Sequence, residues 1–282
     1  MNFINENYKN LAEKANANKD AYKSAEPYPS ISFKNFFDEK MLNEVLEEFE
    51  DLDKGATLKF ESPNEIKLAS KGEQRFGPKT KAFVHYLNSE PFLEFLQVLT
   101  GIEETLIPDP FFEGGGFHQT KAGGFLKIHA DFNKHKLTKL DRRLNILIYL
   151  NKDWKDEYGG HFEMWDKEMT RCVKKFAPEF NTLAMFNTTD FTYHGLPNPL
   201  TCPPDRSRKS IALYYYSNGR PATEVNHGLE DHNTLFVARK TAEDEAMRSF
   251  NKKQGVKDLV KDLTPPVVFR LAKKVLGQNN EQ

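Results

Sequence analysis

Three residues in the middle of the chain have side chains of the types that bind transition metals. His129 and Asp131 lie two positions apart in the strand-like segment 125–131, and His194 follows much later. Side chains at positions i and i+2 of a strand point to the same face, so the first two can reach one ion. A lone His-x-Asp pair is common among surface residues, but His194, at the end of another strand-like run, completes a set of two histidines and one carboxylate. Such a facial set suits iron(II) and leaves coordination positions open, so the sequence predicts a metal centre at these three residues.

An arginine and two hydroxyl groups are spaced so that they could bind an organic acid beside this metal. Arg208 and Ser210 share one face of the strand-like run 208–214, and Tyr149 lies in another such run. A guanidinium binds a carboxylate through two parallel charge-assisted hydrogen bonds and keeps its proton, while a hydroxyl can add a third bond. Arg208 and Ser210 therefore predict a clamp for the distal carboxylate of a co-substrate such as 2-oxoglutarate. Tyr149 fits either this clamp or an ordinary core position.

Other residues with reactive side chains have simpler interpretations. His118 fits a pocket-lining residue or a structural histidine on a strand. His227 and His232 could suggest a second metal site, but no matching ligand pair follows at a recognisable spacing, which favours a polar surface loop. Cys202 lies among prolines with no evident base beside it, so it is assigned no catalytic role.

The elements that must position these residues are short strands. From about Leu106 to Ser217, apolar or alternating runs are separated by Gly, Pro and Asn. The clearest runs are 124–131, 144–150, 161–165, 182–186 and 210–216. Many short strands with turn signals and no intervening helical pattern indicate a sandwich or barrel.

Helices are predicted on both sides of this β-rich region. Asp38 is the expected N-cap of a helix whose apolar residues fall on one face, and Ser89 and Gly101 are expected to bound another. After a charged connection, Phe83, Tyr86 and Leu87 suggest a further helix between these two, and the first two dozen residues are polar enough to fray. The tail from about Glu243 returns to helical character.

The bulk properties indicate a globular protein of one large or two small domains. The chain has 282 residues, of which 38% are hydrophobic, and its 40 basic and 41 acidic residues give a net charge of −1. Near neutrality gives no reason to expect nucleic acid as a partner. The two cysteines cannot form a disulfide framework, and no apolar run resembles a secretory signal or approaches the ~18 residues of a membrane span. We therefore expect a cytoplasmic protein.

Residues 124–216 resemble the 2-oxoglutarate- and iron(II)-dependent oxygenases of the prolyl 4-hydroxylase superfamily, which include the hypoxia-factor and ribosomal-protein prolyl hydroxylases. Five elements occur in the order typical of this superfamily, which makes the set more specific than any one of them. In order, they are His129-x-Asp131, the run from Arg143 to Asn151 with Lys152-Asp153-Trp154, Gly159-Gly160, His194, and Arg208-x-Ser210.

The resemblance implies a mainly β fold with flanking helices: a double-stranded β-helix (jelly-roll) core with N-terminal helices and a C-terminal helical tail. The expected regions are a polar N-terminal extension (1–26), a helical support region (27–105), the jelly-roll core (106–217) and a partly helical, basic C-terminal extension (218–282). The resemblance further implies that His129, Asp131 and His194 hold iron(II), that Arg208 pairs with 2-oxoglutarate, and that Tyr149 and Ser210 assist. O2 is then the other co-substrate and ascorbate the expected reductant.

The chain departs from the prolyl hydroxylases at two places beside this site. Leu126 stands where many of them have a tyrosine, and the loop from His194 to Arg208 carries four prolines and is longer than in the hypoxia-factor enzymes. The expected reaction is hydroxylation of an unactivated C–H bond with release of succinate and CO2. Its substrate stays open between a prolyl residue of a protein or peptide and a small molecule or glycan precursor.

Two functions without catalysis are also compatible with the sequence. One is a jelly-roll protein that only binds a sugar or small molecule, against which the intact Arg208 and Ser210 argue. The other is a scaffold that contacts an anionic membrane surface through Arg270, Lys273 and Lys274 of the C-terminal tail. Packing of that tail against the sheet, with its lysines in water, is the simpler interpretation.

Overall fold

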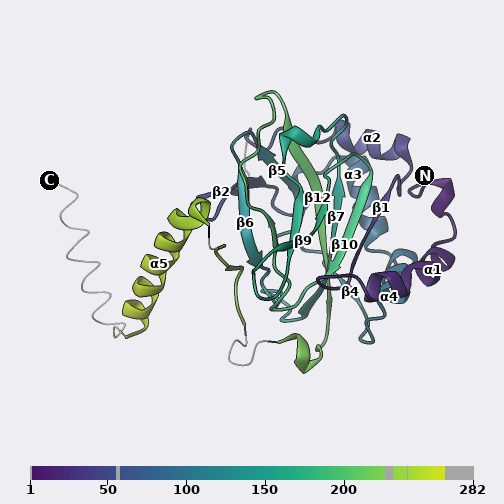
Figure 1. The fold of residues 1–282 in the computed structure, drawn as a ribbon. Coiled ribbons are helices and arrows are strands. Elements are labelled where there is room, and N and C mark those ends of the chain that lie inside the picture. Colours follow the sequence, from purple (N-terminus) through teal and green to yellow (C-terminus); the bar gives the residue numbers. More distant parts are fainter. Residues whose placement is uncertain (1, 55–57, 226–230, 240, 264–282) are drawn as a thin grey trace. The chain divides into compact units, whose positions relative to one another are not determined.

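The computed structural model describes residues 2–54, 58–225, 231–239 and 241–263, with side chains up to residue 255. The chain divides into a large unit that ends at Val237 and a small unit that begins at Ala238 (Figure 1). All predicted site residues lie in the large unit.

The large unit is built on one strongly curved, mostly antiparallel sheet. In the described part of the chain its strands pair in the order β1-β10-β7-β12-β5-β3-β6-β11-β8-β9, with β2, β4 and β13 attached to β3, β12 and β6. The sheet forms a nearly closed, jelly-roll-like barrel, and Lys174 of β9 donates to the carbonyl of Ser30 in β1 at 3.4 Å, which joins the two ends of this order. The strand bounds are β1 (Ser30–Lys34), β2 (Leu58–Ser62), β3 (Glu65–Ala69), β4 (Ile107–Pro108), β5 (Gly116–Lys121), β6 (Phe125–Ala130), β7 (Asp141–Tyr149), β8 (Phe162–Trp165), β9 (Cys172–Phe176), β10 (Thr182–Asn187), β11 (His194–Leu196), β12 (Ser207–Ser217) and β13 (Leu235–Phe236).

Four helices lie together on one side of these strands (Figure 1). They are α1 (Leu11–Lys23), α2 (Glu39–Glu47), α3 (Pro78–Leu87) and α4 (Glu90–Thr100). Asp38 caps α2 as predicted, since its Oδ1 accepts from the backbone N–H of Met41 at 2.8 Å, and Gly101 ends α4 in the left-handed conformation with φ +64°. Ser89 occupies the N-cap position of α4 but makes no side-chain capping bond, because its hydroxyl donates to the carbonyl of Tyr86.

Alternation along the central strands separates the main core from the barrel interior. On β7, Leu144, Ile146 and Ile148 belong to the core that the helices cover. The intervening Leu147 and Tyr149 lie with aromatic and apolar residues of β8 and β10 instead. The same period of two on β12 places Ile211 and Leu213 in the main core, and Arg208 and Ser210 on the interior face. The two faces of one sheet thus provide both the packing and the candidate site.

The structure corrects three expectations about the boundaries of these regions. Residues 11–23 do not fray but form α1, which packs on α4 and buries Ala15 and Tyr22. The stretch expected as a charged connection contains the hairpin β2–β3, whose alternating apolar residues around Pro63 and Asn64 were a readable strand signal. Finally, β13 pairs with β6, so the large unit continues to Val237, beyond the expected end of the core at 217.

The small unit contains α5 (Glu245–Leu263), in agreement with the helical tail predicted from Glu243. Its first turn is preceded by a buried ion pair between Arg239 and Asp244, with Nη2 and Oδ1 2.9 Å apart. Arg270, Lys273 and Lys274 lie outside the described residues. None of the helices in the described ranges is long and apolar enough to cross a lipid bilayer.

Candidate active site

The three predicted metal ligands meet inside the barrel. His129 is on β6, Asp131 follows the end of that strand, and His194 on β11 pairs directly with His129 across the two strands. Asp131 Oδ1 lies 3.4 Å from His129 Nε2, and its Oδ2 lies 3.2 Å from His194 Nε2. One ligand atom from each residue lies within 4.8 Å of the others, a spacing that lets all three bind one ion.

Backbone hydrogen bonds orient both histidine rings toward this point. Each Nδ1 faces the carbonyl two residues earlier in the chain, at 2.8 Å for His129 and 2.9 Å for His194. A proton on Nδ1 then leaves the Nε2 lone pair of each ring for a metal, which is the second-shell arrangement typical of metal-binding histidines. Burial, followed by the nearby His194, lowers the pKa of His129 and favours the neutral ring that a metal requires.

Two residues of the 141–149 strand hold the Asp131 carboxylate. Arg142 Nη2 lies 3.1 Å from Oδ2, and the side-chain amide of Asn145 donates to the same oxygen at 2.7 Å. Burial by itself raises the pKa of Asp131, but Arg142 and the two histidines outweigh it and hold the pKa well below its usual range. Asp131 is therefore ionised and fixed in direction before any ion binds.

Sequence reasoning missed Arg142 and Asn145. Asn145 could have been found, because it has the same strand phase as Tyr149, which the sequence placed beside the site. Arg142 could not, since the register of β7 against β12 shifts opposite Tyr215 and Tyr216, so simple alternation fails at that end of the strand.

The predicted carboxylate clamp lies in the same cavity. Arg208 and Ser210 line it together with the three metal-binding candidates, and its volume is about 80 Å³. Arg208 is 5% exposed; its Nε donates to the carbonyl of Gly160 at 2.8 Å and its Nη2 to the Tyr149 hydroxyl at 3.3 Å. No carboxylate in the described part of the chain forms an ion pair with this buried guanidinium.

Tyr149 is therefore placed behind the clamp: it is fully buried, and its hydroxyl accepts from Arg208. Burial raises the pKa of this hydroxyl, which stays protonated. The residues that line the cavity do not include Tyr149, so the structure places it next to Arg208 and outside the cavity wall.

Gly160 shows why the Gly159-Gly160 element accompanies the clamp. Its φ is +73°, and a Cβ there would lie 2.6 Å from Leu200 Cδ2 and 3.0 Å from Arg208 Cδ. Leu200 belongs to the proline-rich loop between β11 and β12, where it packs with Cys202 and Tyr158. This loop thus closes over Gly160 and holds the carbonyl that orients Arg208.

The remaining walls of the cavity are mixed in character. Leu126 and the β-sheet residues Leu147, Phe162 and Phe186 supply apolar surface, while Lys67, His118 and Thr120 supply polar groups. His118 thus lines the pocket, as one of its two interpretations expected. Burial and the neighbouring Lys67 lower its pKa to about 3, so it is neutral, and its Nε2 donates to the carbonyl of Gly114 at 3.0 Å.

His232 lies in a loop whose neighbouring residues Asp231 and Asn233 are exposed, as expected of a polar surface loop, but its own side chain is buried. Its side chain is 4% exposed, and Nε2 lies 2.9 Å from the buried Asp190 carboxylate. His227 lies outside the described residues. Among the residues that the structure describes, the one group of three or more histidine, cysteine or acidic side chains placed to share an ion is that of His129, Asp131 and His194.

The donor set fits a first-row metal with an organic acid beside it. Two neutral imidazoles and one carboxylate on one side of the ion leave the opposite side open, as in iron(II) oxygenases. The buried guanidinium of Arg208 lacks an anionic partner in the described structure, and an unpaired buried charge is costly. A dicarboxylate that bridges the metal and Arg208 would satisfy both.

Comparison with known proteins agrees with this geometry. Residues 115–216 match the family model of the 2OG-Fe(II) oxygenase superfamily, whose members use iron(II), 2-oxoglutarate and O2. The sequence comparison with curated proteins finds no match.

Solved structures with the same fold include three prolyl hydroxylases. The Pseudomonas putida prolyl-4-hydroxylase is 14% identical, with a TM-score of 0.53 over 73% of this chain and 100% of that one. A Trichoplax adhaerens prolyl hydroxylase, in complex with a hypoxia inducible factor oxygen degradation domain peptide fragment, is 17% identical, with a TM-score of 0.55 over 75% and 92%. A Phytophthora capsici prolyl 4-hydroxylase is 16% identical, with a TM-score of 0.50 over 89% and 76%. At these identities the likeness shows the fold.

Proposed function

We propose that this chain, a dioxygenase that carries a 2OG-Fe(II) oxygenase domain over residues 115–216, hydroxylates an unactivated C–H bond of its substrate while 2-oxoglutarate is converted to succinate and CO2. One observation carries the proposal. The cavity that holds His129, Asp131 and His194 also contains Arg208, a buried cation with no carboxylate partner in the described structure. An organic-acid co-substrate would supply the anion that this guanidinium lacks.

The residues of the chain divide the work of this reaction. His129 and His194 would bind iron(II) through Nε2, and Asp131, oriented by Arg142 and Asn145, would supply the anionic ligand. When bound, the iron supplies the oxidation that couples loss of CO2 from 2-oxoglutarate to insertion of oxygen into the substrate C–H bond.

Arg208 would fix the distal carboxylate of 2-oxoglutarate, with the Ser210 hydroxyl beside it and Tyr149 behind it. Because Gly160 already orients the guanidinium through Nε, the Nη atoms keep their remaining N–H groups for the carboxylate. Leu147, Phe162 and Phe186 supply apolar walls to the same cavity, and a lower local dielectric there would strengthen the ion pair.

For the substrate we propose a prolyl residue of a protein or peptide. The likeness in fold to three prolyl hydroxylases supports this, as does the peptide bound to the one from Trichoplax adhaerens. Oxidation of a small molecule or glycan precursor is the second candidate, favoured by Leu126, which lines the cavity where many prolyl hydroxylases have a tyrosine. Ascorbate as reductant and a cytoplasmic location, where both free cysteines stay reduced, are parts of the same proposal.

The test is succinate formation by the purified protein. We expect the wild type with iron(II), ascorbate and 2-oxoglutarate to form succinate on admission of O2, at a low rate until the substrate is supplied. The His129→Ala variant should form no succinate. The Arg208→Ala variant should form succinate only at a higher concentration of 2-oxoglutarate. His85→Ala, on the exposed face of α3, is the matched control and keeps the wild-type rate. Absence of both succinate and iron-dependent 2-oxoglutarate binding in the wild type would refute the proposal in favour of a non-catalytic binding protein.

A further inference from the structure

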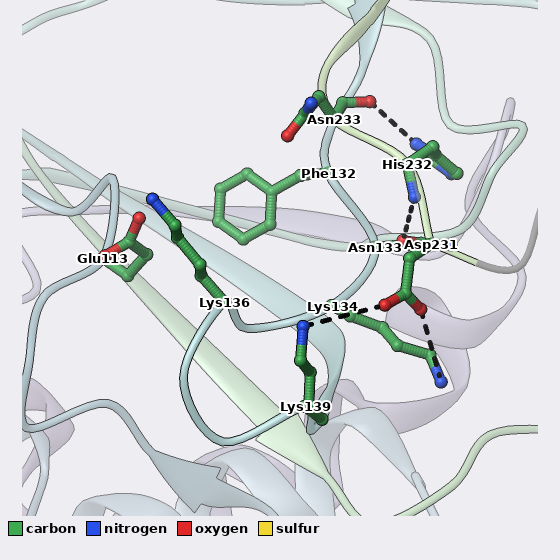
Figure 2. A pocket seen from close by; sticks show the side chains of 9 residues that line it. All are labelled: Glu113, Phe132, Asn133, Lys134, Lys136, Lys139, Asp231, His232 and Asn233. Carbon is green, nitrogen blue, oxygen red and sulfur yellow. Dashed lines mark hydrogen bonds and ion pairs between the residues drawn. The ribbon is translucent and has the colours of Figure 1, made fainter. Parts of the chain in front are cut away.

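A second cavity, of about 370 Å³, lies beside the candidate active site and is lined by three lysines (Figure 2). We call it the lysine cavity. Its walls come from the connection between β6 and β7 on one side and from residues 231–233 on the other. The lining residues are Glu113, Phe132, Asn133, Lys134, Lys136, Lys139, Asp231, His232 and Asn233.

The lysines project from a connection with a fixed conformation. His135, 1% exposed, accepts at Nδ1 from the backbone N–H groups of Leu137 and Thr138, at 3.2 and 3.1 Å, so its Nε2 carries the proton and faces Asp109. The backbone N–H of His135 donates to the carbonyl of Leu140 at 2.8 Å. The turn that carries the three lysines is thus built around one buried histidine, which limits the entropy lost when the turn binds a ligand.

The opposite wall is tied to the same connection. The backbone N–H of His232 donates to Asn133 Oδ1 at 3.0 Å, while the buried His232 ring faces Asp190. Figure 2 shows the bond between His232 and Asn133, with Asp231 directed at Lys134 and Lys139. Both walls are therefore held in place before a ligand enters.

Positive charge exceeds negative charge in this cavity. Lys134 and Lys139 share the single carboxylate of Asp231 at 3.7 and 3.9 Å, near the outer limit for an ion pair. Lys136 forms no ion pair within the described residues, although Glu113 lines the same cavity. Three ammonium groups and two carboxylates leave an excess of one positive charge.

One layer of side chains separates the lysine cavity from the metal-binding residues. Phe132 lines the lysine cavity and makes an edge contact with Tyr214, which lines the active-site cavity. The Arg142 guanidinium packs against both rings, 4.3 Å from the Phe132 centroid and 3.5 Å from that of Tyr214, and contacts Asp131. The lysine cavity therefore adjoins the active-site cavity on the other side of this layer.

We infer that the lysine cavity binds an anionic group, a carboxylate or phosphate, of the molecule that is oxidised at the iron. This rests on the proposed function and adds the charge class of its substrate. Asp231 acts in the empty cavity as an internal substitute for the ligand anion. Leu137 of the same turn is 64% exposed, and Phe111, whose ring lies 5.8 Å from that of His135, is 54% exposed. These two side chains give an adjoining surface for an uncharged part of the substrate.

Phosphorus relaxation of inorganic phosphate tests the inference without a known substrate. The full-length protein would be loaded with Mn(II) and saturating 2-oxoglutarate, which occupies the metal, and phosphate titrated while its ³¹P relaxation is followed. Saturable, metal-dependent enhancement is expected. Each of three substitutions should raise the phosphate concentration at half-saturation by roughly three- to tenfold, as expected for loss of one partly exposed charge-assisted contact. They are Lys134→Gln, Lys136→Gln and Lys139→Gln.

Two further variants sharpen the result. Asp231→Asn removes the internal substitute and should strengthen phosphate binding, a change of opposite sign that simple loss of structure cannot give. Lys81→Gln, on the exposed face of α3 and outside the lysine cavity, removes the same charge and should leave half-saturation unchanged. No saturable enhancement, or enhancement insensitive to the three lysines, overturns the inference.

Competition separates the two sources of the anion. If the substrate is an acidic peptide, hexaglutamate should displace phosphate at a lower concentration than free glutamate does. If the substrate is a small anion, the two competitors should act at equal concentration per carboxylate. Hexaglutamine, the uncharged control, should not displace phosphate. Mn(II) and 2-oxoglutarate binding are read separately from water-proton relaxation and calorimetry. If those fail, the proposed function fails with the inference; if they hold and phosphate does not bind at the lysines, the inference alone is wrong.

Discussion

Replacement of Arg208 by methionine separates a binding role of this residue from a structural one. Methionine has a similar length but carries no charge and no donor. Arg208 is buried without an anionic partner in the described structure, so its charge is a cost in the absence of ligand. Its bond to the Gly160 carbonyl offsets part of that cost. We expect the two effects nearly to cancel, with a change of less than about 1 kcal/mol in the free energy of unfolding without ligand.

The effect on 2-oxoglutarate binding should be much larger. Two charge-assisted hydrogen bonds at about 1.5 to 3 kcal/mol each give a loss of roughly 3 to 6 kcal/mol, and a dissociation constant raised by roughly 10² to 10⁴. With metal bound, 2-oxoglutarate at a hundred times the wild-type dissociation constant stabilises the wild type by about 2.7 kcal/mol. For a unit of this size that is a rise in Tm of roughly 5 to 11 °C, which Arg208→Met should almost abolish.

Thermal unfolding with Mn(II), with and without 2-oxoglutarate, measures both quantities in one experiment. Arg171→Met, which removes an exposed arginine beside β9, is the control and should keep the full 2-oxoglutarate shift. A loss of more than about 3 kcal/mol in the variant without ligand would show that Arg208 has a structural partner. An unchanged 2-oxoglutarate shift would show that the co-substrate binds elsewhere.

Three other substitutions test how the site is supported. Gly160→Ala should destabilise the protein by roughly 2 to 3 kcal/mol and raise the KM for 2-oxoglutarate, because the added Cβ meets atoms at 2.6 and 3.0 Å. At Gly159, φ is also positive but nothing lies within 4 Å, so Gly159→Ala should cost only about 1 kcal/mol. Chemical denaturation measures both values. Asn145→Ala frees the Asp131 carboxylate, and calorimetry with Mn(II) should show affinity reduced by roughly 10- to 100-fold; unchanged affinity would mean that Arg142 suffices. Glu48 accepts from two backbone N–H groups and a hydroxyl at the start of α3, and these bonds outweigh partial burial and lower its pKa. A lowered folded-state pKa contributes stability at pH values above the unfolded pKa of about 4.5, and this stability is lost as the pH falls through the folded pKa. Glu48→Gln should therefore lower the free energy of unfolding by about 1 kcal/mol at pH 7 and by progressively less in acid. A loss that does not depend on pH would contradict this.

The predictions that held were those governed by local spacing. A period of two along a strand determines which side chains share a face, so His129 with Asp131, and Arg208 with Ser210, could be paired from the sequence. Helix caps are equally local, as Asp38 and Gly101 show. The jelly-roll fold was likewise predicted, from the order of motifs spread over 124–216.

The predictions that failed concerned segments whose structure depends on distant partners. Residues 11–23 are polar by composition, yet they form α1 because α4 offers a surface that buries Ala15 and Tyr22. The two-residue strand β13 has too little sequence for a pattern and exists because β6 provides an edge beside His129. In both cases burial against another element supplies the free energy that the local sequence lacks.

The sequence by itself determined which chemical groups this protein has and which of them point the same way. Only the tertiary structure decided that His194 lies opposite His129, that Arg142 contacts Asp131, and that Arg208 is left without a counter-ion. It also decided that three lysines surround a cavity next to the metal-binding residues. The reason is physical: side-chain direction follows from dihedral angles within a few residues, whereas distance between charges, burial and the absence of a partner depend on how segments far apart in the chain pack together.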